Sequence, residues 1–155
     1  MGEVPSSNQG TCVALTYHPS RGSIVTVRFE PGFVPPEMVK RRLAVVLSPA
    51  IRNRPGLCTV VPLSTTDPEE GKVMPYHYKF RAGFEMPKEW GDIERWVKGD
   101  MVCTVGWHRV DLLRLGKRLD GSRIYQKSTI SDADFAQVQR CVLHGLGLST
   151  LTKHI

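Results

Sequence analysis

The sequence predicts a small, mainly antiparallel β-barrel with one α-helix packed across it. Three observations favour this class. Short apolar or alternating runs recur along the chain. Proline and glycine residues separate these runs and mark turns. A helical periodicity occurs only near the C-terminus. With 155 residues, 41% of them hydrophobic, the chain has enough apolar material for one ordinary domain core.

The first half of the chain is expected to supply three strands. Ile24–Phe29, Leu43–Leu47 and Leu57–Leu63 are rich in valine, isoleucine and leucine, as buried strands are. Residues 31–38 contain three prolines, which cannot extend a ladder, so this segment is predicted to be a loop. Residues 52–56 carry asparagine, proline and glycine and predict a turn.

The second half predicts shorter elements. Tyr76–Phe80 alternates rings with polar groups, as a half-buried strand does. Residues 83–99 are predicted to be irregular, with a short helical turn at Pro87–Trp90. Met101–Val105 is predicted to be a strand, and a further short strand is an option at Arg123–Tyr125.

The C-terminal helix has a start signal, an apolar face and stop signals. Ser131 and Asp134 have the spacing of a capping box. Gly145 and Gly147 are typical of a helix end. Four apolar residues recur at steps of three and four and predict the buried face: Phe135, Val138, Val142 and Leu146.

Residues 1–20 show no clear periodicity. They are expected to form an N-terminal extension that either adds a strand or is partly disordered, before a domain spanning 21–155. No apolar run reaches the roughly 20 residues of a membrane span, and the start lacks the features of a signal peptide. A cytoplasmic location is therefore expected, without membrane attachment.

Charge and cysteine content narrow the range of partners. The formal net charge of +6 favours an anionic partner, such as nucleic acid or an acidic protein segment. The four cysteines have no metal-ligand spacing, so they are interpreted as reduced thiols. No metal ion and no other cofactor is predicted.

Two segments carry the clearest chemical signal. Three cations, Lys40, Arg41 and Arg42, precede one predicted strand, and three hydroxyl residues, 64–66, end the next. If these strands pair, guanidinium and hydroxyl groups converge on one rim of the sheet. Such a rim suits a phosphodiester, because arginine grips two phosphate oxygens at once.

The order and spacing of five motifs resemble the MazF/PemK family of bacterial toxins. The motifs are Arg21–Val25, which resembles the family's opening strand; Phe29–Pro31; Glu37, five residues before Arg42; Arg42–Pro49; and Pro62–Thr65. The resemblance implies a small SH3-like antiparallel β-barrel of the MazF/PemK/CcdB type with a C-terminal helix.

That resemblance also implies a function. It implies the toxin of a type II toxin–antitoxin system: a homodimeric, metal-independent endoribonuclease (mRNA interferase) of the bacterial cytoplasm that cleaves single-stranded RNA and leaves a 2′,3′-cyclic phosphate. An acidic antitoxin would cover the RNA groove. The alternatives are a CcdB-like toxin that binds gyrase without catalysis, or a degenerate member that binds RNA or protein.

Carried over residue by residue, the family's catalytic positions fall on Arg42 and Ser64, with Thr65 beside the serine. Arg42 would stabilise charge in the transition state; the alternative is an ordinary surface cation at a strand start. The family's Asp-Gln-x-Arg run is replaced by residues 105–108, so the proton carrier is open. His77 and His108 are the candidates, because histidine titrates near neutral pH, with Glu37 in reserve as a base.

A further set is predicted to bind RNA outside the reacting atoms. Trp107 could stack on an unpaired base, although a buried core tryptophan is an equal alternative. Five cations are candidate contacts to backbone phosphates or, alternatively, a solvated basic face: Lys40, Arg41, Arg52, Arg54 and Arg109.

Overall fold

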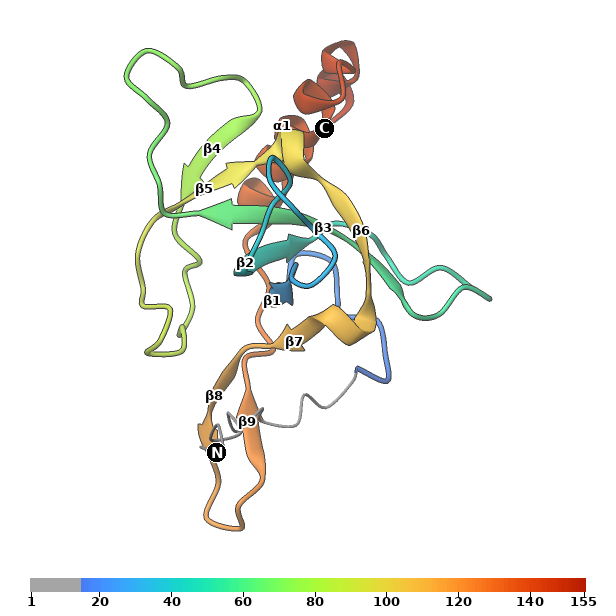
Figure 1. The fold of residues 1–155 in the computed structure, drawn as a ribbon, viewed down its shortest axis with the longest axis vertical. Coiled ribbons are helices and arrows are strands. Elements are labelled where there is room, and N and C mark those ends of the chain that lie inside the picture. Colours follow the sequence, from blue (N-terminus) through green and yellow to red (C-terminus); the bar gives the residue numbers. More distant parts are fainter. Residues whose placement is uncertain (1–14) are drawn as a thin grey trace, which may run out of the picture.

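The computed structural model describes residues 15–155, so most of the predicted N-terminal extension lies outside the described residues. Short strands lie between residues 24 and 125, with two short 3-10 helices among them, and the helices α1 and η3 occupy the end of the chain (Figure 1). The elements are β1 (Ile24–Arg28), β2 (Arg41–Val46), β3 (Leu57–Ser64), β4 (His77–Phe80), β5 (Arg95–Lys98), η1 (Gly99–Met101), β6 (Cys103–Gly106), η2 (Trp107–Arg109), β7 (Val110–Leu112), β8 (Arg114–Lys117), β9 (Arg123–Tyr125), α1 (Asp132–Gly145) and η3 (Ser149–His154).

Seven strands form one sheet in the order β4-β5-β3-β2-β1-β7, with β6 paired to residues 57–60 of β3, on the edge that β5 also uses. The pairings within it are antiparallel. β8 and β9 make a separate two-stranded ribbon. This arrangement confirms the predicted mainly antiparallel β architecture with a C-terminal helix.

Alternation along the strands gives the sheet two faces, each with its own core. We call them the helix face and the far face. On the helix face, α1 covers a cluster that includes Leu43, Val45, Val61, Leu63, Val97, Val138, Cys141 and Val142. The far face buries Val25, Val27, Phe29, Ala44, Val46, Cys58, Val60, Val105 and Val110. The valine-rich runs therefore serve two cores, which is why they lack simple alternation.

The helix begins as predicted. The Asp134 amide donates to the Ser131 Oγ at 3.1 Å, which caps the first turn. Val138 and Val142 are buried, as their spacing predicts. Leu146 is 57% exposed, because it lies just past the end of α1, so its assignment to the buried face was wrong. No helix in residues 15–155 is long and apolar enough to cross a membrane.

Strand β5 falls within residues 83–99, which were predicted to be irregular. Arg95 at its start is buried, and its guanidinium donates to the backbone oxygens of Trp90, Gly91 and Ile93. The charge is therefore satisfied by the preceding loop, and pairing with β3 and β4 holds the strand. β7 and β8, with three and four residues, were also not predicted.

The predicted strand Met101–Val105 starts late, at Cys103. The preceding residues form the short helix η1, which packs under α1. A Cβ atom added to Gly99 would lie 2.4 Å from the Cys141 backbone. Gly99 therefore allows η1 to pack closely against α1 before the strand begins.

Candidate functional site

On the far face, the apolar core gives way to polar side chains at the end of β3. Continuing the β2–β3 register by two residues sets Arg42 opposite Ser64. Ser64 pairs with Trp96, and Trp96 pairs with Lys79. Directly opposed residues of antiparallel strands project from the same face. We call these four residues the polar row; it crosses β2, β3, β5 and β4.

Arg42 is half-buried, and its Nε donates to the Val39 carbonyl at 3.3 Å. Its terminal nitrogens make no hydrogen bond or ion pair with residues 15–155. Arg41 is different: it faces the other way, pairs with Glu89 at 3.3 Å and lies over the Trp90 ring at 5.2 Å. Of these two arginines, Arg42 is the one whose guanidinium can still grip an anion.

The two hydroxyl residues of the candidate site lie at the end of β3. Ser64 is half-buried, and its Oγ accepts a hydrogen bond from the Thr66 amide at 3.1 Å. Its own O–H remains to donate to an anion on the far face. Thr65 is exposed and lies in the bend directly after β3.

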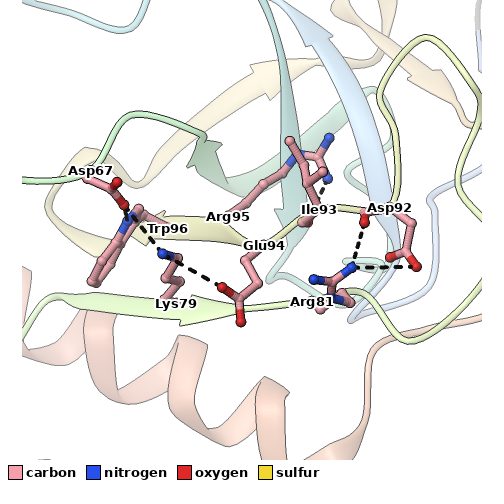
Figure 2. A network of polar contacts seen from close by, with 8 residues as sticks. All are labelled: Asp67, Lys79, Arg81, Asp92, Ile93, Glu94, Arg95 and Trp96. Carbon is pink, nitrogen blue, oxygen red and sulfur yellow. Dashed lines mark hydrogen bonds and ion pairs between the residues drawn. The ribbon is translucent and has the colours of Figure 1, made fainter.

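Trp96 and Lys79 are members of the row that the sequence reasoning missed. The Trp96 Nε1–H donates to Asp67 Oδ1 at 2.7 Å, and the Lys79 ammonium lies 3.5 Å from the same oxygen and 3.7 Å from Glu94 (Figure 2). The Trp96 hydrogen bond, then Lys79, lowers the pKa of Asp67. The carboxylate fixes the indole, whose face lies 5.5 Å from the Lys79 nitrogen.

His77 extends the row on the same face, opposite Lys98. Its Nδ1 accepts from the Met74 amide at 3.1 Å, and its ring centroid lies 6.1 Å from that of Trp96. Burial, and then the nearby Lys98 charge, lowers the pKa of His77, against an opposing effect of Asp100. The ring is therefore held neutral near pH 7, with its proton on Nε2.

We expect an NMR titration of His77 to show a midpoint below about 6.5, the ordinary histidine value. The unfolded chain then binds a proton at a higher pH than the folded chain. His77 should therefore make folding less stable as the pH falls below about 6.5. Spectra of wild type and His77→Gln would assign the resonance, and a midpoint above 6.5 would contradict the expectation.

Trp107 and His108 lie in η2, which starts beside Leu57 at the other end of β3. The Trp107 Nε1–H donates to the Leu57 carbonyl at 3.2 Å. A pocket of about 380 Å³ beside this indole is lined by His18, Ala50, Ile51, Asn53, Arg54, Pro55 and Trp107. In the described part of the chain, no hydrogen bond or ring contact joins the His108 side chain to the polar row.

The remaining predicted residues are not members of the polar row. Arg109 donates to the carbonyls of Arg28 and Phe29 at 3.2 and 3.0 Å, so its guanidinium is engaged in the fold. Glu37 is exposed in the β1–β2 loop, where its Oε2 accepts from the Val34 amide at 2.8 Å. Three candidate RNA contacts are exposed: Lys40, Arg52 and Arg54.

Metal-binding side chains do not gather in the described region. Residues 15–155 contain no group of three or more histidine, cysteine, aspartate or glutamate side chains that could hold a metal ion. The Lys79 ammonium is already paired with Asp67 and Glu94. The groups that remain for a ligand are a guanidinium, a hydroxyl and an imidazole N–H, on Arg42, Ser64 and His77. These donors suit an anionic ligand, and a phosphodiester in particular.

This chain is similar to known proteins over most of its length. Residues 20–146 match a family profile described as the PemK-like, MazF-like toxin of type II toxin–antitoxin systems. The putative uncharacterized protein YifN of Escherichia coli (strain K12) is 28% identical over 152 residues, 97% of this chain and 93% of that protein. An uncharacterized protein of Haemophilus influenzae is 30% identical over 128 residues, 77% of this chain and 78% of that protein.

Two solved structures from Deinococcus radiodurans share the fold. A crystal structure of MazF (Form-I) has a TM-score of 0.56 at 23% identity, covering 84% of this chain and 98% of that one. A MazE–MazF structure (Form-II) has a TM-score of 0.50 at 26% identity, covering 86% of this chain and 99% of that one.

Proposed function

Because the chain belongs to the PemK-like, MazF-like toxin family of type II toxin–antitoxin systems, we propose that it is a metal-independent endoribonuclease acting on single-stranded RNA. The observation that carries the proposal is the polar row. The terminal guanidinium nitrogens of Arg42 make no hydrogen bond or ion pair within residues 15–155, and the β2–β3 register, continued by two residues, sets Arg42 opposite Ser64. Trp96 lies next in the row and offers an aromatic surface beside the phosphate position.

RNA supplies its own nucleophile for such a reaction. The 2′-oxygen forms a bond to the adjacent phosphorus and loses its proton, while the bond from phosphorus to the 5′-oxygen breaks and that oxygen gains a proton. The products are a 2′,3′-cyclic phosphate and a 5′-hydroxyl. The chain must stabilise the extra negative charge on the phosphate, and we assign this role to Arg42, with Ser64 as a second donor.

His77 can act on the same phosphate. Its Nδ1 is engaged by the Met74 amide, so the neutral ring presents Nε2–H to a ligand. A neutral imidazole N–H is a good hydrogen-bond donor and a poor proton donor at pH 7. We therefore propose that His77 donates to a phosphate oxygen. Proton transfer then falls to another group, with Glu37 and His108 as the candidates.

Cleavage should persist in excess EDTA, because the nucleophile is the 2′-hydroxyl and a guanidinium carries the charge stabilisation. The measurement is gel analysis of a labelled single-stranded RNA with and without EDTA. Product 3′ ends that resist ligation until the cyclic phosphate is opened and the resulting phosphate is removed would support the proposed reaction. Cleavage that requires added divalent ions would contradict it.

One observation favours a second candidate, a toxin that binds its target without catalysis, as CcdB-like toxins bind gyrase. The family's Asp-Gln-x-Arg run is absent, and the neighbouring Arg109 is engaged by backbone oxygens. Intact RNA in the EDTA assay, together with loss of gyrase supercoiling activity on addition of the protein, would favour this candidate over the ribonuclease.

We also propose an acidic antitoxin as a protein partner, and a homodimer as the active form, in the bacterial cytoplasm. The likeness to a MazE–MazF structure supports the antitoxin partner, and the net charge of +6 suits an acidic segment. An acidic segment lying over the polar row would compete with RNA for Arg42, which would make the antitoxin an inhibitor.

A further inference from the structure

The β8–β9 ribbon stands apart from the rest of the sheet. Its strands pair with each other and, in the described residues, with no other strand. In Figure 1 it projects at the opposite end of the long axis from the C-terminal helices. Leu119 at its tip is fully exposed. A two-stranded ribbon gains little stability by itself in water, so this projection contributes little to the core.

The ribbon concentrates the charge of the chain. Residues 114–127 contain five cationic side chains and one carboxylate, a net charge of +4 out of the chain's +6. The cations are Arg114, Lys117, Arg118, Arg123 and Lys127. All five are exposed, and none forms an ion pair within residues 15–155.

The single carboxylate does not neutralise these cations. Asp120 Oδ1 accepts from the Ser122 amide at 2.8 Å and from the Ser122 hydroxyl at 2.6 Å, and these bonds lower the pKa of Asp120. The Arg118 amide donates to the Ser122 carbonyl at 2.8 Å, which closes the turn. Asp120 therefore shapes the tip of the ribbon, and the charge on both strands stays uncompensated.

Two of the cations face each other directly. Lys117 pairs with Arg123 in the β8–β9 register, so both side chains project from one face of the ribbon. Like charges directly opposed across a ladder destabilise it. The ribbon thus carries a small stability cost that an anion lying between the two side chains would remove.

We propose that this ribbon, residues 114–127, is a second RNA-binding surface that contacts backbone phosphates outside the cleavage site. The inference rests on the proposed ribonuclease function. The ribbon leaves the sheet through β7, which lies two strands away from β2 and Arg42 in the order β2-β1-β7. The ribbon therefore lies outside the polar row, which crosses β2, β3, β5 and β4, and only an RNA longer than the one that fills the row could contact both surfaces. Phosphate contacts of this kind add affinity without reading sequence.

The test compares wild type with Lys117→Gln/Arg123→Gln, using 2′-O-methyl RNA, which cannot be cleaved. Binding is measured for a short RNA of about 6 nucleotides and a long one of about 25 nucleotides. For the long RNA we expect the Kd to rise about tenfold near 0.15 M salt. The steepness of the plot of log K against log salt should fall by about 1.4, because each of the two lost phosphate contacts to a single strand removes about 0.7. The short RNA should change less than about twofold.

The control variant Lys88→Gln/Lys153→Gln removes the same charge from two exposed lysines elsewhere and should leave both affinities near wild type. Unchanged binding of the long RNA by Lys117→Gln/Arg123→Gln would overturn the proposal, and so would an equal loss for short and long RNA. Binding of poly-glutamate is measured for the same variants. If Lys117→Gln/Arg123→Gln binds poly-glutamate more weakly but binds the long RNA as wild type does, the ribbon is a site for an acidic protein segment instead of RNA. Because the RNA is uncleavable, these outcomes are independent of whether the chain is a ribonuclease.

Discussion

Replacing Arg42 with alanine is expected to lower kcat/KM for RNA cleavage by about 100-fold or more, the usual effect of removing a donor that stabilises an oxyanion. The Arg42 terminal nitrogens are unpaired in the described chain, and the register places them on the face that Ser64 shares. The fold should survive, because the side chain is only half-buried at the start of β2. Cleavage kinetics on a labelled RNA, alongside thermal unfolding, would measure both.

Arg41→Ala is the matched control, because Arg41 precedes Arg42 in the same strand but faces the other way, against Glu89 and Trp90. We expect it to keep activity within a few-fold of wild type. Arg42→Lys should remain poor, because a point charge cannot replace a planar fork. Near-normal cleavage by Arg42→Ala would remove this residue from the mechanism.

The location of Arg42 and Ser64 at one end of the β2–β3 pair could be predicted from the sequence, because each residue flanks a valine-rich run with turn signals beside it. If the two runs are adjacent antiparallel strands, the start of the first strand lies beside the end of the second. The capped helix at Ser131 was predictable for the same local reason. In both places local propensity and the final fold agree, which is what makes a prediction from one sequence succeed.

The other half of the polar row could not be predicted in this way. Trp96 lies in a four-residue strand that starts with a buried arginine, and that arginine is satisfied only by loop carbonyls brought close by folding. The alternation of Tyr76–Phe80 did indicate that His77 and Lys79 share a face. It gave no sign that Trp96 would lie opposite Lys79, because this contact depends on strand register between distant segments.

The two candidate histidines also illustrate what folding adds. In the sequence, His77 and His108 are both histidines in or just after predicted strands. In the structure, His77 lies beside Trp96 in the polar row, whereas His108 lies in η2, after the end of β6 that pairs with Leu57. The tautomer of His77 is fixed by a turn, Met74 to His77, that no periodicity predicts.

We therefore expect His77→Ala to lower the cleavage rate by about 100-fold, the effect of losing a donor to the phosphate. His77→Gln should recover most of this loss, because its side-chain amide can present an N–H near the position of Nε2. If another group carries the proton, His108→Ala should lower the cleavage rate much less than His77→Ala does. Single-turnover rates between pH 5 and 8 would compare the three variants with wild type.

The glutamine variant decides the chemistry of His77. Equal loss in His77→Ala and His77→Gln, with a wild-type pH–rate profile that bends between about pH 5 and 8, would make the imidazole a proton carrier rather than a neutral donor. A loss of about 100-fold in His108→Ala would assign the carrier to His108 instead. Full activity in a variant lacking both rings would exclude histidine from the reaction. Glu37 in the β1–β2 loop would then be the base, with Arg42 alone on the phosphate.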